Sequence, residues 1–159
     1  MKPGALKVQS AMAQRGLARE IIELPVLART SQQAADALGV AVGQIAKSLV
    51  FVVDGRPLLV IASGANRVDE AALGRLTGGT LKRADPETVK QATGYTIGGV
   101  PPIGHAVALP VYIDRDLLQY DLVYGAAGVP ECVFPLSPDE LVRATGGSVV
   151  DVKETRGPR

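Results

Sequence analysis

The stretch IAKSLVFVVDGRPLLVIAS, residues 45–63, decides the fold of this chain. Two apolar runs flank Asp54-Gly55, a dipeptide that strongly indicates a two-residue turn between antiparallel strands. Such a turn sets the register of the two strands and places Lys47 opposite Ala62. We therefore predict a long β-hairpin at the centre of the fold.

Helix start and stop signals surround this hairpin. The clearest is Ser137-Pro138 with Glu140, a cap, a proline and an acidic residue, closed by Gly146. Similar signals predict helices over residues 5–15, at AADAL (34–38), and over 70–77, 86–93 and 138–145. For AADAL, Thr30 and Gln33 are expected to form a capping box, and for 70–77 the cap is Asp69.

Short apolar runs between the helices predict further strands. We expect them at Ile21–Leu24, Thr80–Arg83, Ala106–Leu109, Val111–Ile113, Leu122–Tyr124, Cys132–Phe134 and Ser148–Val150. Hairpins mixed with helices are typical of an α+β fold, a compact single domain with a mixed, mostly antiparallel β-sheet flanked by helices. We assign residues 1–152 to this domain and 153–159 to a loose C-terminal tail.

Composition excludes several classes of function. The chain has 159 residues, 47% of them hydrophobic, and a formal net charge of +1, which argues against disorder and against a basic coat for duplex DNA. A small basic pocket for one RNA end stays compatible with this charge. Because the chain has one cysteine and one histidine, we expect no internal disulfide and no Cys/His metal site. We also expect no cofactor. Lacking a long apolar run, it is expected to be cytoplasmic, without a membrane partner.

Lys47 is anomalous in the predicted hairpin. On a strand it shares a face with Leu49, Phe51 and Val53, which are core-type residues. A cation at the mouth of a pocket can hold a phosphate or a carbonyl oxygen. The alternative is a lysine whose stem packs at the strand start while its ammonium reaches water.

A glycine- and proline-rich loop follows the fourth predicted helix, at Gly98-Gly99-Val100-Pro101-Pro102. Glycines let a backbone approach a ligand closely, and the N–H groups of the first three residues are free to donate to an oxyanion or a carbonyl. Prolines have no N–H and stiffen the loop. The alternative is an ordinary turn.

Two further features are less specific. The polar segment SGANR, residues 63–67, could contact a ribose or a phosphate, or could simply lead into the next helix. His105 follows the glycine-proline loop, and a lone histidine is more often structural than catalytic. Asp114 is expected to cap a short helix, and Cys132, within an apolar run, to be buried.

The ordered set of motifs resembles the YbaK/EbsC family, also called prolyl-tRNA synthetase-associated or insertion-like editing domains. The resemblance extends from about Leu24 to Asp151. It rests on TS..AA..LG (30–39), QIAKSLVF (44–51), SG..RVD (63–69) and TGYTIGGVPPIGH (93–105), with the ending TGG (145–147) in agreement.

This resemblance implies a free-standing aminoacyl-tRNA deacylase. Such proteins remove a wrong amino acid from tRNA, most often a small one from tRNA(Pro), in trans to a synthetase such as prolyl-tRNA synthetase. The implied catalytic residues are Lys47, Gly98, Gly99 and Val100. The implied substrate-binding residues are Ser63, Gly64, Asn66, Arg67, Pro101, Pro102, His105, Leu49 and Tyr95.

The absence of a catalytic triad is compatible with this chemistry. An aminoacyl ester is already activated and has a ribose hydroxyl beside it, so positioned water and a stabilised oxyanion suffice. The candidate walls of the amino acid pocket are Val100, Pro101, Ile103 and Leu49, and Glu131 is a weaker candidate for the site. A binding module without turnover, holding a tRNA end, a nucleotide or a partner protein, is the alternative; a phosphate-binding protein unrelated to translation is a third, less favoured class.

Overall fold

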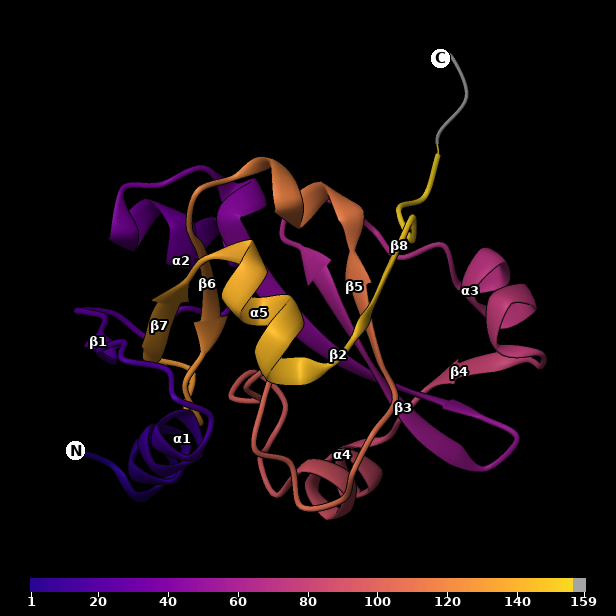
Figure 1. Ribbon diagram of the computed structural model, residues 1–159, viewed down its shortest axis with the longest axis horizontal. Coiled ribbons are helices and arrows are strands. Elements are labelled where there is room, and N and C mark those ends of the chain that lie inside the picture. The colour runs from indigo at the N-terminus through magenta and orange to yellow at the C-terminus, as the bar shows by residue number, and fades with distance from the viewer. Residues whose placement is uncertain (156–159) are drawn as a thin grey trace.

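Within the described residues, eight strands form one mixed sheet, and five α-helices lie around it (Figure 1). The computed structural model describes residues 1–155. The strands are β1 (Ile22–Glu23), β2 (Ile45–Val53), β3 (Arg56–Ser63), β4 (Leu81–Arg83), β5 (Val111–Asp114), β6 (Val123–Ala126), β7 (Cys132–Leu136) and β8 (Ser148–Val150). They follow the order β1-β7-β6-β2-β3-β5-β8, and β4 pairs with β2.

The sheet confirms the predicted α+β fold class. Four strand pairs are antiparallel, namely β1–β7, β6–β7, β2–β3 and β2–β4, and three are parallel, namely β2–β6, β3–β5 and β5–β8. The central hairpin has the predicted register, with Lys47 opposite Ala62. Asp54 and Gly55 have φ values of 51° and 77°, the positive values that a type I′ turn requires.

The helices lie where predicted: the last three have the expected bounds, the first spans 3–14 instead of 5–15, and the second begins at 31 instead of 34. They are α1 (Pro3–Gln14), α2 (Ser31–Leu38), α3 (Glu70–Thr77), α4 (Pro86–Thr93) and α5 (Pro138–Thr145), with short 3₁₀ helices η1 (Val42–Gln44) and η2 (Arg115–Gln119). Asp69, Asp85 and Ser137 each accept a backbone N–H three residues on. At α2 only half of the predicted capping box forms. The Thr30 hydroxyl accepts the N–H of Gln33, but the Gln33 side chain accepts the N–H of Arg29 and not that of Thr30.

Packing places apolar side chains on both faces of the sheet. The largest cluster joins β3 to α1, α4 and α5, through residues such as Leu59, Val8 and Leu141. A second cluster packs α3 against the opposite side of the hairpin, where Phe51 is fully buried. A third packs α2 against the first residue of β2 and against β7. In Figure 1, α1 and α4 lie below the sheet and α3 lies at the right.

Two predictions about the chain are wrong. Residues 106–109 form no strand, because the N–H groups of Ala106 and Val107 donate to carbonyls at the end of α4. The expected loose tail is anchored at its start. Lys153 forms a β-bridge with Val68, and Glu154 donates its N–H to Arg67 O. The rest of the predicted tail, residues 156–159, lies outside the described part of the chain, and the assignment of one domain to 1–152 stays a prediction.

Candidate active site

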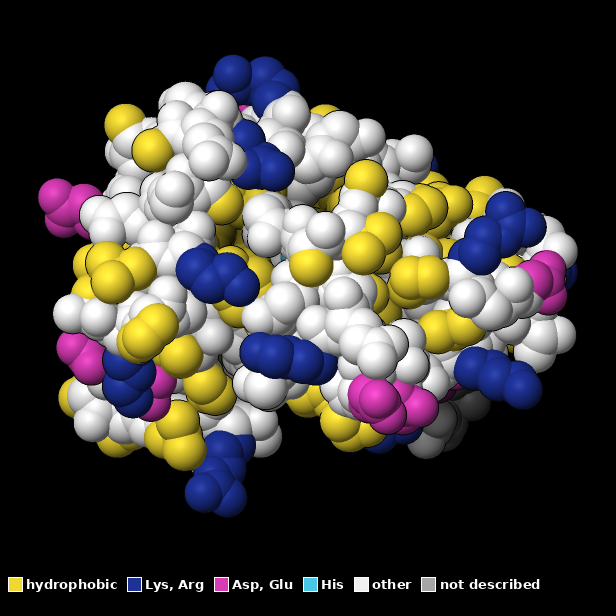
Figure 2. All heavy atoms as spheres, turned by 90° about the horizontal axis from the view of Figure 1, so that it is seen from below, with side chains coloured by type: hydrophobic (Ala, Val, Ile, Leu, Met, Phe, Trp, Pro, Cys, Tyr) yellow, Lys and Arg dark blue, Asp and Glu magenta, His cyan; other side chains and the backbone are white. Residues whose placement is uncertain are grey.

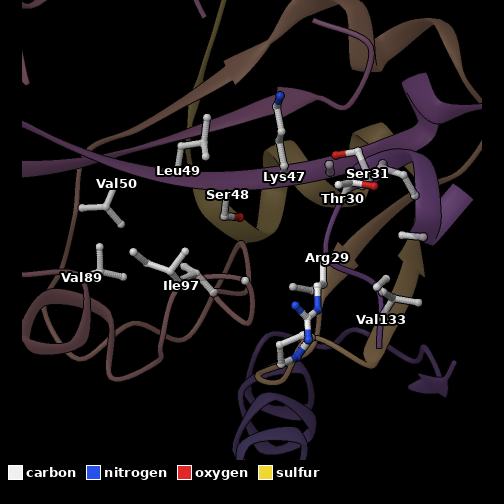
Figure 3. Close-up of a pocket in the computed structure, with 18 of the residues that line it drawn as sticks. Arg29, Thr30, Ser31, Lys47, Ser48, Leu49, Val50, Val89, Ile97 and Val133 are labelled. Atoms are coloured by element: carbon white, nitrogen blue, oxygen red, sulfur yellow. The ribbon is translucent and has the colours of Figure 1, made fainter. Parts of the chain in front are cut away.

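A cavity of about 340 Å³ runs along one edge of β2. Every residue from Ile45 to Phe51 lines it. Side chains alternate between the two faces of a strand, so a cavity lined by an unbroken run lies against the strand edge. Figure 3 shows this alternation, with Lys47 and Leu49 on one side of the strand and Ser48 and Val50 on the other.

The cavity fills a gap in the strand pairing of β2. On this edge, β6 pairs only with Ile45 and Ala46, and β4 pairs only with Phe51–Val53. Within the described residues, no strand pairs with Lys47–Val50 on this side. We call these four residues the free edge of β2.

Lys47 lies at the predicted position on the strand. Its ammonium donates to Asn66 O at 2.9 Å, and its side chain is half-buried. Burial lowers the pKa of Lys47 below its usual value, and the nearby Arg83 guanidinium lowers it further, against a smaller opposing effect of Asp114. A lysine in this environment gains more from an anionic or carbonyl partner than an exposed lysine does.

The glycine-proline loop reaches the cavity through two of its residues, Gly98 and Val100. One prediction about it is wrong, because the N–H of Gly99 is not free: it donates to Thr96 O at 3.0 Å. Gly99 also does not line the cavity. Among the described residues, no acceptor is found for the N–H groups of Gly98 and Val100, which leaves these two as candidate oxyanion donors.

Close backbone packing holds this loop from behind. Gly128 donates its N–H to Gly99 O at 3.0 Å. A Cβ on Gly99 would lie 2.6 Å from Gly128 O, and a Cβ on Gly4 would lie 2.8 Å from the same oxygen. Glycine at these positions therefore lets the loop, the β6–β7 turn and α1 pack backbone against backbone.

His105 supports the loop from outside the cavity. Its Nε2 lies 2.7 Å from Pro101 O, and because a carbonyl only accepts, this nitrogen carries the proton. Burial lowers the pKa of His105, which favours the neutral ring. His105, Pro101 and Pro102 do not line the cavity. The structure therefore does not bring these three predicted substrate-binding residues to the cavity lining.

The SGANR loop uses two of its polar side chains, those of Ser63 and Asn66, for hydrogen bonds within the protein. The hydroxyl of buried Ser63 donates to Gly43 O at 2.8 Å. The side-chain amide of Asn66 donates to Asp114 and Asp116, each at 2.9 Å. Asp114 also caps η2, as predicted. The structure does not bring the predicted residues of this loop to the cavity lining, namely Ser63, Gly64, Asn66 and Arg67.

Of four other candidates, Leu49, Ile103, Tyr95 and Glu131, the structure places only Leu49 at the cavity lining. Leu49 lines the cavity, whereas Pro101 and Ile103, the other expected wall residues besides Val100, do not. Tyr95 is buried in the main core, with Lys7 over its ring. Glu131 forms an ion pair with Lys2 at 3.1 Å, away from the lining, although its neighbour Pro130 does line the cavity.

Sequence reasoning missed much of the lining. The missed residues are Ala28, Arg29, Thr30, Ser31, Ala34, Ile45, Ala46, Ser48, Val50, Phe51, Arg83, Ala84, Val89, Ile97, Tyr124, Ala126, Pro130 and Val133. A signal existed for Ser48, a polar residue between Ala46 and Val50 on the other face of β2 from Lys47. Most of the others come from segments that only the tertiary structure brings together.

The surface carries no strong charge pattern on the face seen from below. Figure 2 shows Lys and Arg side chains there as separate points among apolar and neutral groups. This distribution is unlike the continuous basic stripe of a duplex-binding protein. Over the described residues, the helices lack the length and apolar character needed to cross a membrane.

Comparisons with known proteins match this chain to one family. YwhH of Bacillus subtilis, named as uncharacterized, is 32% identical over 135 residues, 84% of this chain and 86% of YwhH. EbsC of Enterococcus faecalis, provisionally described as a Cys-tRNA(Pro)/Cys-tRNA(Cys) deacylase, is 26% identical, covering 77% of this chain and 76% of EbsC. A proline–tRNA ligase of Solidesulfovibrio magneticus is 36% identical over 100 residues, 61% of this chain and only 17% of the ligase.

A solved structure agrees over nearly the full length. A crystal structure provisionally described as a trans-editing enzyme for prolyl tRNA synthetase superposes with a TM-score of 0.94 at 47% identity, covering 98% of this chain and 99% of the other. Residues 26–144 match the model of the aminoacyl-tRNA editing domain. The chain therefore belongs to the family of aminoacyl-tRNA editing domains, as its motifs predict.

Proposed function

We propose that this protein hydrolyses the ester of mischarged tRNA(Pro) that carries a small non-cognate amino acid, acting in trans after a synthetase such as prolyl-tRNA synthetase has released it. The observation that carries the proposal is the cavity along β2, whose lining combines Lys47 with Gly98 and Val100. A volume of about 340 Å³ suits an aminoacyl group and part of its terminal nucleoside. The names of EbsC and of the ligase relatives support the choice of tRNA(Pro). The substrate places the activity in the cytoplasm.

The reaction needs no protein nucleophile. The oxygen of a water molecule attacks the ester carbonyl carbon, and the bond between that carbon and the ribose oxygen breaks. The ribose oxygen leaves as a hydroxyl with a proton from the water, and the amino acid leaves as its acid. The neighbouring ribose hydroxyl orients the water, and the N–H groups of Gly98 and Val100 stabilise the oxyanion. Lys47 holds the terminal nucleotide or the ester carbonyl.

Selection among amino acids follows from the size of the cavity. Its apolar wall includes Val50, Val89, Ile97 and Val100. One methylene changes binding in such a pocket by only about 1–3 kcal/mol, so exclusion of the larger cognate residue discriminates better than attraction of the smaller one. We therefore expect prolyl-tRNA(Pro) to be spared.

The test is deacylation of tRNA(Pro) charged with Ala, Cys, Ser, Thr or Pro. We expect hydrolysis of at least one small ester, no hydrolysis of the prolyl ester, and a loss of about 100-fold or more in Lys47→Ala. Lys82→Ala removes an exposed lysine from β4 and serves as the matched control. Binding of the charged end without turnover of any ester would replace the enzyme by a binding module.

A further inference from the structure

The free edge of β2 carries backbone groups that the fold leaves unused. In an antiparallel hairpin, alternate residues bond to the partner strand and the others face outward. Gly64 donates its N–H to Ile45 O at 2.7 Å, so odd-numbered residues of β2 bond toward β3. Val50 faces outward, since its carbonyl accepts from Ala84 N–H at 3.1 Å. Ser48 also faces outward, and no strand among residues 1–155 lies opposite it.

Ser48 therefore presents both its N–H and its C=O to the cavity. Pairing with β6 ends at Ala46 and pairing with β4 begins at Phe51. The Ser48 hydroxyl has no partner within the described residues either. Backbone polar groups removed from water are almost always paired, so an unpaired strand residue in a cavity indicates a ligand with matching groups.

An aminoacyl ester has the matching groups. Its α-ammonium is a donor and its carbonyl is an acceptor, separated by one carbon as in a single residue of a strand. Two directly opposed residues of an antiparallel ladder exchange two hydrogen bonds of this kind. Resting on the proposed function, we propose that the aminoacyl group forms a one-residue β-bridge with Ser48: the α-ammonium donates to Ser48 O, and Ser48 N–H donates to the ester carbonyl.

The charges in the cavity agree with a carbonyl acceptor for the ammonium. None of the described residues that line it is Asp or Glu, whereas Arg29, Lys47 and Arg83 are basic. The α-ammonium therefore has backbone carbonyls and hydroxyls to bind but no carboxylate. The bridge also gives the ester carbonyl a further donor, the Ser48 N–H. The Gly99 N–H cannot take this place because it donates to Thr96 O.

The first experiment removes the ammonium from the substrate. The best ester of the panel is compared with its α-hydroxy acid analogue, lactyl for alanyl or glyceryl for seryl, each rate divided by its spontaneous rate. We expect the acceleration to fall about tenfold or more, as for loss of a charged hydrogen bond. Equal accelerations would overturn the bridge and leave the deacylase intact. Hydrolysis of no ester at all would remove the proposed function instead.

The second experiment removes the N–H of the protein. Ser48→Pro deletes an outward N–H without deleting a bond to β3, and proline tolerates such an edge position. Ser48→Ala keeps the N–H and is the matched variant. We expect kcat to fall about tenfold or more in Ser48→Pro relative to Ser48→Ala, while Ser48→Ala keeps the preference for the amine over the hydroxyl. Equal kcat in two folded variants would contradict the bridge.

A binding measurement keeps the inference testable if Ser48→Pro does not fold or if turnover is absent. The probe is 3′-alanylamino-3′-deoxyadenosine, whose amide link resists hydrolysis. In NMR spectra of the wild type, we expect the Ser48 amide to shift with this probe and to stay in place with adenosine. A Ser48 amide that responds equally to both compounds would overturn the proposal.

Discussion

The two loops that sequence reasoning placed in the site, residues 63–67 and 98–102, differ in how they use their polar groups. The first is rich in hydrogen-bonding side chains. The Ser63 hydroxyl donates to Gly43 O, and the Asn66 amide donates to the carboxylates of Asp114 and Asp116. The second has no polar side chain, yet two of its residues line the cavity. A polar loop can thus spend its hydrogen bonds within the protein, while a loop of glycine and proline lines the cavity.

The largest expected effect breaks the backbone packing behind the second loop. Gly128 has a φ of 89°, and a Cβ there would collide with the carbonyl of Gly4. We expect Gly128→Ala to cost about 3 kcal/mol of unfolding free energy and to reduce deacylation, because the clash moves the turn bonded to Gly99. Urea denaturation and the deacylation rate measure the two effects.

Gly146→Ala is the control for that substitution. Gly146 also has a positive φ, 65°, but no atom of the described residues lies within 4 Å of the position that a Cβ would take. It should cost only the backbone strain, about 1–2 kcal/mol, with deacylation unchanged. Equal losses of stability and of activity in both variants would show that the close packing of Gly4, Gly99 and Gly128 does not position the loop 98–102.

A smaller effect is expected in the first loop. Asn66→Ala leaves buried Asp114 with one donor fewer and should cost about 1–3 kcal/mol of unfolding free energy. Its activity per folded molecule should fall less than that of Gly128→Ala, since Asn66 does not line the cavity. Thermal unfolding and single-turnover deacylation test this, with exposed Gln91→Ala as control. Wild-type stability combined with lost activity would assign the Asn66 side chain to the substrate.

The smallest effect concerns the histidine beside the second loop. Burial lowers the pKa of His105 in the folded protein, so the unfolded chain binds more protons below the usual value of about 6.5. The stabilisation is complete above that pH and is lost as the pH falls through it, by at most about 1.4 kcal/mol per pH unit. In urea titrations, His105→Gln should lack this slope while still donating to Pro101 O. Parallel pH profiles for both proteins would contradict it.

Local signals predicted most of the fold but only four residues of the cavity lining, namely Lys47, Leu49, Gly98 and Val100. The Asp54-Gly55 turn depends only on these two residues and fixes a two-residue connection between the strands. This connection sets the register and pairs Lys47 with Ala62. The caps at Asp69 and Ser137 satisfy donors within one helical turn. The strand expected at 106–109 does not form, because the N–H groups of Ala106 and Val107 donate to the carbonyls of Thr93 and Ala92 at the end of α4.

The sequence by itself determined the hairpin, the bounds of α3, α4 and α5, the family and the face of β2 on which Lys47 lies, because each depends on residues close together in the chain or on a motif. Tertiary structure alone decided that the Asn66 side-chain amide donates to Asp114 and Asp116 and that Ser48 lacks a partner strand among residues 1–155. Those outcomes depend on which distant groups meet: β6 and β4 pair with either end of β2 and stop short of its middle. Hydrogen bonds and steric contacts act only over a few ångströms, so the composition of a segment cannot reveal them.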